Sequence, residues 1–354
     1  MLKIGLLMTA CFWLVACVQT DITIAPKATK PSTLPEPLSN QAVAYMNLDG
    51  QHRFFVFNGL RAGKTFRDIT NQAHVWMQGQ WHQLPVPATQ QPVLASVAVV
   101  VKNHVYLMGG YTVAADHSEQ SIPHVWKIDG RTLQWQAMPA MPTPVDDTVA
   151  LVYQDRYIYL ISGWHDVDNV DLVQVFDTET LNWHQAIPID FPAVFGHAGA
   201  ISGNQMLVCD GVKVDYTDAG IKQFLPSPVC ALGTIDPNDV KQIDWQAAPH
   251  HSGTAYYRMA ANQNDKGQMI FVGGSDNPYN YDGIGYNKTP ANASDRVRWF
   301  SLAENKWRTE RPGIPANMDH RGLLKTPEHW VILGGMRNSQ QVTKEIIYLK
   351  RGID

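Results

Sequence analysis

The stretch Val105-Tyr106-Leu107-Met108-Gly109-Gly110 decides the fold, because versions of it recur along the chain. Each version is a short β-prone run that ends in glycine. The other five span residues 54–59, 158–163, 206–211, 269–274 and 330–335. Their closing glycines lie 51, 53, 48, 63 and 61 residues apart. Self-similarity at about fifty residues indicates a repeat architecture rather than one irregular core.

Tryptophans keep the same period. They stand at Trp81, Trp135, Trp183, Trp245 and Trp307, which are 54, 48, 62 and 62 residues apart. A glycine allows the backbone to turn tightly against a neighbour, and a tryptophan strand can bury its ring between adjacent sheets. Each unit is therefore predicted to hold four short strands, for example 96–101, 105–110, 172–176 and a Trp strand. The alternative is a pair of β-sandwiches with accidental periodicity, and six matched units argue against it.

Repeats of about fifty residues with a double glycine and a downstream tryptophan resemble the kelch family. The Gly-Gly pairs at 109–110, 273–274 and 334–335 carry the resemblance, whereas Asn58-Gly59, Ser162-Gly163 and Asp210-Gly211 are degenerate versions. The resemblance implies an all-β, six-bladed β-propeller with four-stranded blades over residues 41–354.

The sixth unit lacks a Trp strand, since only 19 residues follow Gly335. An open ring of blades would expose a strand edge. We therefore expect the N-terminal segment around residues 21–33 to supply the missing outer strand and close the last blade.

The N-terminus has the features of an export signal. Residues 1–16 combine a basic start with a short apolar run, which is typical of a signal peptide. Leu14-Val15-Ala16-Cys17 resembles a bacterial lipobox, which implies lipidation at Cys17; the alternative is a plain signal peptide that contains a cysteine. By the same resemblance, Val18, which is not Asp, implies an outer-membrane lipoprotein facing the periplasm. Residues 17–40 are polar and contain four prolines, as in an extended tether.

Composition and charge exclude several other classes. The chain has 354 residues, of which 45% are hydrophobic, so a large core is possible and disorder is excluded. A net charge of −4 offers no basic patch for nucleic acid. Beyond the signal, no apolar run is long enough to span a bilayer, so the membrane is contacted through the lipid anchor only.

Cys209 and Cys230 are predicted to form a disulfide. They fall on the second and third strands of the fourth unit, which are antiparallel neighbours, and export places them in an oxidising compartment. The alternative is a pair of buried free thiols.

A ligand site is expected where propellers open, at the starts of the inner strands and in the loops between second and third strands. Alignment of the units on their glycines places five polar residues at one equivalent position: Ser96, Thr148, His197, Arg258 and Arg321. Asp146, Asp147, Asp319 and His320 lie on the same loops. Arginine pairs with carboxylates and aspartate accepts sugar hydroxyls, so the set predicts a small carbohydrate or anionic sugar as partner. The alternative is that these side chains only satisfy loop carbonyls.

Two further segments contain candidate binding residues. The long loop 275–295 alternates tyrosine with Asn and Asp, and Asp276, Tyr279 and Tyr281 are candidates for binding a carbohydrate; a plain rim insertion would look similar. Trp164 is a further candidate, whereas the acidic residues 166–171 lack the Gly and closing Glu of a calcium loop. We expect a solvated rim there, with no metal and no cofactor.

Among exported bacterial kelch proteins, the chain is similar to the N-acetylneuraminate epimerases, the sialic-acid mutarotases. The shared features are the predicted export, the glycine and tryptophan rhythm, and the long loop before the Trp strand of the fifth unit. The resemblance implies an isomerase that opens and recloses a pyranose with one acid and one base. His197, Asp147 and Asp210 are the candidate catalytic residues, with Arg258 and Arg321 as carboxylate clamps.

The sequence departs from that family at one important position. A glutamate follows the glycine of the fourth unit in the epimerases, whereas Val212 stands here, so Asp210 would have to substitute for it. The competing hypothesis is a non-enzymatic envelope propeller that binds a glycan or a protein partner, because one fold hosts many functions.

Overall fold

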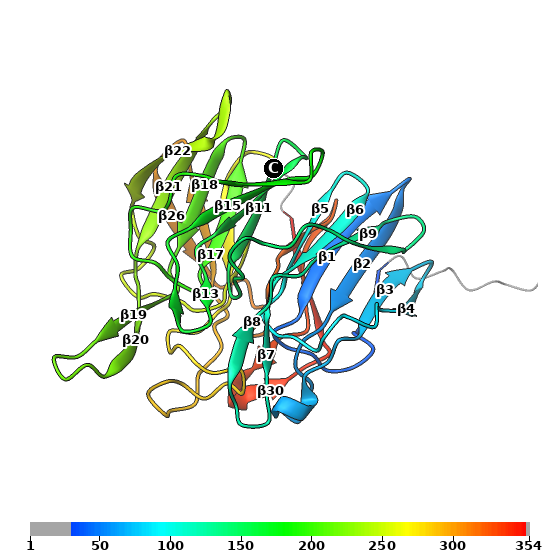
Figure 1. Cartoon of the computed structure of the whole chain (residues 1–354), viewed down its shortest axis with the longest axis horizontal. Coiled ribbons are helices and arrows are strands. Elements are labelled where there is room, and N and C mark those ends of the chain that lie inside the picture. The colour runs from blue at the N-terminus through cyan, green and yellow to red at the C-terminus, as the bar shows by residue number, and fades with distance from the viewer. Residues whose placement is uncertain (1–29, 352–354) are drawn as a thin grey trace, which may run out of the picture.

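The computed structural model describes residues 30–351, which form six antiparallel sheets around a central channel (Figure 1). The expected signal peptide, Cys17 and the first part of the tether lie outside the described residues. Within residues 30–351, helical structure is limited to two short 3-10 turns, η1 (Phe66–Asp68) and η2 (Asn338–Gln340). The predicted six-bladed, all-β propeller is confirmed.

The blades follow one another along the chain, each running from its inner to its outer strand. Blade one is β1 (Ala42–Leu48), β2 (Gln51–Phe57), β3 (Ala73–Met77) and β4 (Gln80–Leu84). Blade two is β5 (Val97–Val101), β6 (His104–Met108), β9 (Val125–Asp129) and β10 (Trp135–Ala137). Blade three is β11 (Val149–Tyr153), β12 (Tyr157–Ile161), β15 (Val173–Asp177) and β16 (Asn182–Gln185).

The second half of the ring repeats this order. Blade four is β17 (Ala198–Ser202), β18 (Gln205–Cys209), β21 (Cys230–Asp236) and β22 (Asp239–Ala248). Blade five is β23 (Ala260–Gln263), β24 (Met269–Val272), β25 (Val297–Ser301) and β26 (Lys306–Glu310). Blade six has three strands: β27 (Leu324–Lys325), β28 (His329–Leu333) and β31 (Ile346–Lys350).

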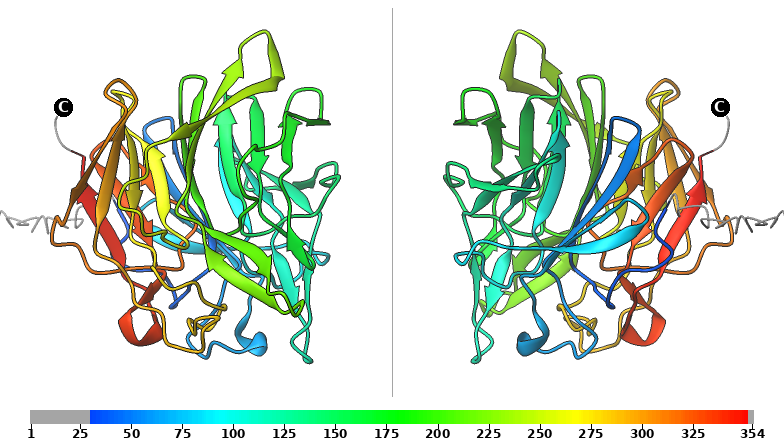
Figure 2. Two further views of the ribbon diagram at one scale, coloured as in Figure 1. Left: turned by 90° about the vertical axis from the view of Figure 1, so that its left-hand side faces the viewer. Right: turned by 90° about the vertical axis from the view of Figure 1, so that its right-hand side faces the viewer.

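The connections between second and third strands all extend from one face, which we call the hairpin face; it is the lower side in Figures 1 and 2. Four of them form small hairpins: β7 (Tyr111–Val113) with β8 (Glu119–Ser121), β13 (Trp164–His165) with β14 (Asp168–Asn169), β19 (Val212–Tyr216) with β20 (Lys222–Pro226), and β29 (Met336–Arg337) with β30 (Gln341–Val342). Blade five carries the long loop 275–295 instead. The hairpin face therefore holds most of the irregular chain.

In blades three, four and five the outer tryptophan donates a hydrogen bond to the edge of the blade before it. The indole N–H of Trp183 donates to the carbonyl of Pro139 at 3.0 Å, and that of Trp307 donates to the carbonyl of Pro249 at 2.6 Å. Each acceptor lies four residues after the tryptophan of the preceding blade. Trp81, in blade one, makes the same bond to the carbonyl of Thr33 at 2.7 Å. The N-terminal segment thus stands where the outer edge of a preceding blade would end.

Further contacts hold this segment against blade six. Thr33 forms an isolated antiparallel bridge with Glu345, and the Tyr348 hydroxyl donates to the carbonyl of Pro31. The described part of the predicted closing segment, residues 30–33, therefore lies along the open side of blade six. Residues 21–29 of that segment lie outside the described residues.

The repeated glycines are explained by backbone conformation. In all six blades both residues of the pair have positive φ: 53–72° at the first position and 80–119° at the second. Asn and Asp tolerate the left-handed conformation at the first position. At the second position a Cβ would also collide with backbone, for example 2.5 Å from the Leu94 carbonyl oxygen at Gly110. The degenerate pairs therefore keep glycine only where it is indispensable.

The predicted disulfide is present. Cys209 and Cys230 are directly paired across β18 and β21, and both are buried. The bond joins the two middle strands of blade four.

Candidate functional site

A ring of left-handed residues, one in front of each inner strand, closes the channel toward the hairpin face. We call it the collar; it consists of Asn40, Ala95, Asp147, Gly196, Arg258 and Asp319, with φ between 49° and 62°. Five backbone N–H···O=C bonds of 2.7–3.3 Å run around it, each from one member to the member in the blade before, with Asn40 donating to Asp319. The collar thus ties successive blades together through their backbones.

The collar shows that Arg258 and Arg321 are not at the position equivalent to Ser96, as the alignment of the units had predicted. The residue after each collar member is Gln41, Ser96, Thr148, His197, Met259 or His320. Arg258 therefore lies one position before the equivalent of Ser96, and Arg321 lies one position after it. Local glycine spacing could not reveal this, because the connections into blades five and six differ in length.

The collar side chains form a buried ion-pair network. Arg258 donates to Asp147 through Nε at 3.1 Å and through Nη2 at 2.6 Å, and its Nη1 donates to Asp319 at 2.6 Å. Arg321 pairs with Asp147 Oδ1, which Arg258 Nε also contacts, and donates to the Asn40 amide oxygen at 2.7 Å. Two arginines thus meet two aspartates, and the formal charges of the network cancel.

Burial and charge act in opposite directions on Asp147. Burial alone would raise the pKa of its carboxyl, but Arg258 and Arg321 lower it from 3.8 to about 2. Asp147 therefore stays ionised, and its charge holds both guanidinium groups in place. Such a network is costly to break, because each remaining partner would be buried without a counter-charge.

A cavity of about 200 Å³ lies next to the collar on the hairpin face. One wall is aromatic and comes from Trp164, Phe195, Phe224 and Tyr286, and loop 275–295 adds Asn280 and Tyr281. Phe224 and Tyr286 stack with ring centroids 4.2 Å apart, and Phe195 packs edge-on against Trp164 at 5.2 Å. We call this cavity the aromatic pocket.

The polar side of the aromatic pocket carries Glu119, Asp146, Asp147 and Arg258. Ser121 donates its hydroxyl to Asp146 Oδ2 at 2.6 Å. Glu119 lies two residues before Ser121 on β8, so both side chains point to the same side of the strand. Two carboxyl groups outside the ion-pair network therefore face the same cavity.

The pKa values of both carboxyls are raised. Glu119 is exposed as a whole residue, but desolvation of its carboxyl in the pocket raises its pKa to about 7. Burial and the neighbouring charge of Asp147 raise the pKa of Asp146 well above its usual range, which favours the protonated form. Carboxyls with raised pKa values suit acid–base chemistry near neutral pH.

Ser96, Thr148 and His197 have structural contacts. Ser96 donates to the Gly109 carbonyl at 3.0 Å, and Thr148 donates to the Ile161 carbonyl, also at 3.0 Å. His197 Nε2 contacts that same Ile161 oxygen at 2.9 Å, and burial lowers its pKa to about 4. All three lie outside the aromatic pocket, whereas Thr148 and His197 line the channel. A catalytic role for His197 stays a prediction.

Asp210 also lies away from the aromatic pocket, in a cluster with His250 and His251. The two histidine Nε2 atoms lie 2.5 and 2.8 Å from its carboxylate oxygens, a grouping that could hold a metal ion. However, His250 Nδ1 accepts the backbone N–H of Gly253 at 2.8 Å, so the ring proton is on Nε2 and is donated to Asp210. A metal at Nε2 would have to displace that proton, and hydrogen bonding accounts for the cluster.

The remaining candidates divide between the pocket and its surroundings. Trp164 and Tyr281 line the pocket, whereas Tyr279 is buried beside it, with its ring 5.4 Å from the Arg258 guanidinium. Asp276 is exposed and is not among the lining residues. Val212 is buried against Phe195, so the position of the family glutamate holds no acid.

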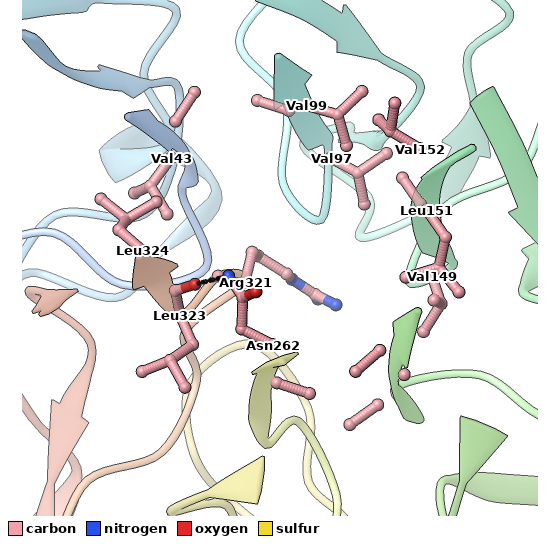
Figure 3. A pocket seen from close by; sticks show the side chains of 18 of the residues that line it. Val43, Val97, Val99, Val149, Leu151, Val152, Asn262, Arg321, Leu323 and Leu324 are labelled. Atoms are coloured by element: carbon pink, nitrogen blue, oxygen red, sulfur yellow. Dashed lines mark hydrogen bonds between the residues drawn. The ribbon is translucent and has the colours of Figure 1, made fainter. Parts of the chain in front are cut away.

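The channel on the other side of the collar has a different lining. It encloses about 360 Å³ between the inner strands, and valine and alanine are the commonest residues of its lining. Figure 3 shows Arg321 extending into this space among Val97, Val149 and Leu323. Arg258 lines both cavities, since it lies at the collar that divides them.

The sequence singled out Trp164, Tyr281, Asp147 and Arg258 but missed Glu119 as an acid–base group. Glu119 lies in a short polar segment with no recognisable motif. Its place in the hairpin after Gly110, on the same face as loop 275–295, was the available signal.

Among residues 30–351, no helix combines the length and apolarity that a bilayer crossing needs.

Comparisons with known proteins agree with this architecture. The kelch motif matches residues 94–142. Kelch-like protein 15 of Gallus gallus is 26% identical over 148 residues, or 42% of this chain and 29% of that protein. Kelch-like protein terF of Aspergillus terreus is 25% identical over 254 residues, or 70% of this chain and 51% of that protein. The chain spans between a quarter and about half the length of these curated relatives.

A solved structure described as "Structure of YjhT" aligns with a TM-score of 0.69 at 14% identity, covering 92% of this chain and 98% of the other. This likeness concerns the fold. The chain therefore has a six-bladed β-propeller fold and carries a kelch motif at residues 94–142.

Proposed function

We propose that the aromatic pocket binds a single sugar ring and catalyses the interconversion of its anomers. The observation that carries the proposal is that Glu119 and Asp146, two carboxyls with raised pKa values, line one cavity together with an aromatic wall. Aromatic faces suit the apolar face of a pyranose, while carboxyls and amides bind its hydroxyls. At about 200 Å³ the pocket is smaller than the range of about 300–1,000 Å³ typical of larger ligands, which favours a monosaccharide.

The proposed reaction needs one base and one acid. Glu119, as the carboxylate, takes the proton of the anomeric hydroxyl, and the bond from the anomeric carbon to the ring oxygen breaks. Asp146 supplies a proton to the ring oxygen, which yields the open-chain sugar with a free carbonyl. Rotation of that carbonyl and reversal of the proton transfers close the ring as the other anomer. Both residues return to their starting states, so no further reactant is consumed.

The test is anomer exchange measured by NMR with D-glucose, D-galactose and N-acetylneuraminate. For an accelerated sugar, Glu119→Gln should lower the rate constant by about 10²–10⁴-fold, the usual contribution of a general base. Glu304→Gln removes an exposed carboxylate far from the pocket lining and should leave the rate unchanged.

The pH dependence gives an independent check. The rate should rise with pH through about 7, because the base is the ionised form of Glu119. Glu119→Gln should lose this rise. Wild-type rates in that variant, or a protein that binds sugars without accelerating exchange, would refute the catalytic assignment.

We also propose that the protein works outside the cytoplasm, attached to the bacterial outer membrane by lipid at Cys17. The lipobox-like residues before Cys17 support this location, as does the Cys209–Cys230 disulfide, because such bonds persist in oxidising compartments. In the natural host, Cys17→Ser should move the protein from the membrane fraction to the soluble fraction, or leave an unlipidated precursor. Unchanged membrane partitioning would contradict lipid anchoring.

A further inference from the structure

Resting on the proposed function, we propose that the aromatic pocket selects neutral monosaccharides and rejects sugar acids. The feature that leads to this inference is the state of the basic groups around the pocket. A site for a sugar carboxylate needs a cation that is free to pair with it. The charged residues of the pocket lining are Glu119, Asp146, Asp147 and Arg258.

Arg258, the basic side chain of that lining, already has two counter-charges. Three of its hydrogen bonds go to carboxylates, two to Asp147 and one to Asp319. Arg321 approaches Asp147 from the channel, and its Nε and Nη2 groups also bind Asn40. The collar therefore presents no net positive charge to a ligand in the pocket.

Glu119 and Asp146 shift the balance further against an anion. Each raises the pocket's negative charge when it ionises, and the two act on each other, since the charge of Glu119 contributes to the raised pKa of Asp146. A bound carboxylate would add a third acidic group to a partly desolvated cavity, where like charges repel more strongly than in water. A hydroxymethyl group at the same place brings no charge and can bind either carboxyl.

Another cation near the aromatic wall is Lys222 on β20. Its Nζ lies 4.4 Å from the Trp164 ring centroid and 5.5 Å from that of Phe224, and it also contacts the Val167 carbonyl. Lys222 is not among the residues that line the pocket, so it belongs to the outer side of the aromatic wall. It provides a suitable control.

The experiment compares sugars that differ only at one carbon. D-galactose and D-galacturonate form one pair, and D-glucose and D-glucuronate form the other, with N-acetylneuraminate as a further acid. Dissociation constants are measured by NMR titration at pH 8, where every acid is ionised. We expect the neutral member of at least one pair to bind at least tenfold more tightly than its acid, and N-acetylneuraminate to bind more weakly than that neutral sugar.

Two variants assign the effect to the pocket charges. Glu119→Gln removes one charge with little change in side-chain shape, so the ratio of neutral-sugar affinity to acid affinity should be smaller in this variant than in the wild type, whatever the change in neutral-sugar affinity itself. Lys222→Ala should leave the ratio unchanged.

The failure of this inference can be told apart from failure of the proposed function. Equal or tighter binding of either uronate or of N-acetylneuraminate would overturn the neutral preference and leave the sugar site standing. An acid affinity that depends on Lys222 would also overturn it. If neither neutral nor acidic sugars bind, the proposed function itself is wrong, and the inference fails with it.

Discussion

The blade edges and the collar make different use of the same sixfold repeat. At the blade edges, equivalent positions carry the same side chain for the same purpose, as when Trp81, Trp183 and Trp307 each donate to a carbonyl of the preceding blade edge. At the collar, equivalent positions share φ values of 49–62° but carry Asn, Ala, Asp, Gly, Arg and Asp. The repeat therefore dictates the backbone of the collar and leaves its side chains free to vary. The side-chain chemistry of the blades therefore differs at positions where their backbone conformation is the same.

Removal of the collar's central cation should have the largest effect. Arg258→Ala leaves Asp147 and Asp319 buried with less or no counter-charge, so we expect the free energy of unfolding to fall by about 3–5 kcal/mol. Urea unfolding followed by tryptophan fluorescence measures the change. Arg308→Ala, on β26 of the same blade, removes an exposed pair with Glu310 and should cost less than about 1 kcal/mol. Similar losses in both variants would contradict a special role for the collar.

The same pair of proteins can be compared in acid. The folded-state pKa of Asp147 is about 2, against 3.8 for the model carboxyl. Its stabilisation is therefore fully present above about pH 4 and is lost as the pH falls through about 2. Arg258→Ala should weaken this acid-dependent step, whereas Arg308→Ala should retain it.

Loss of the disulfide in blade four should cause the next largest loss of stability. It closes a loop with a sequence separation of 21, for which the chain-entropy estimate is about 3 kcal/mol. Cys209→Ala combined with Cys230→Ala should lower stability by about that amount without changing the aromatic pocket. Mass spectrometry after alkylation without reductant gives a direct check on the bond. Alkylation of both Cys209 and Cys230 in the denatured wild-type chain would rule the bond out.

Two glycine substitutions should have the smallest effects, and they test whether a Cβ collision matters at the repeated glycine positions. Gly163 has φ of 119°, and a Cβ there would lie 2.8 Å from the Asp146 carbonyl oxygen. Gly163→Ala should cost about 2–3 kcal/mol, since strain and collision add. Gly203 also has positive φ, 59°, but nothing lies within 4 Å of its Cβ position, so Gly203→Ala should cost only about 1 kcal/mol. Thermal unfolding separates the two, and equal shifts would show that collision contributes nothing.

Local sequence was enough to predict the blades. The Gly-ending strand and the Trp strand are short sequence patterns, and counting their repeats gives the number of blades. The count of six, the outer position of the tryptophans and the Cys209–Cys230 pair could therefore all be predicted. The face that carries the site could also be predicted, because it follows from where second strands end. Trp164 and Tyr281, which line the aromatic pocket, were predicted as binding candidates because they lie in loops that follow a Gly-ending strand.

The chemistry of the site was decided by tertiary structure. Arg258 and Asp147 are 111 residues apart, and Arg321 and Asn40 are 281 apart, so no local pattern relates them. Glu119 acquires its unusual pKa only because the β7–β8 hairpin places it in a desolvated cavity. By itself the sequence determined the repeating backbone, because strand period and glycine conformation are local properties. Only closure of the ring determined which buried charges meet across it, because these contacts join blades that are far apart along the chain.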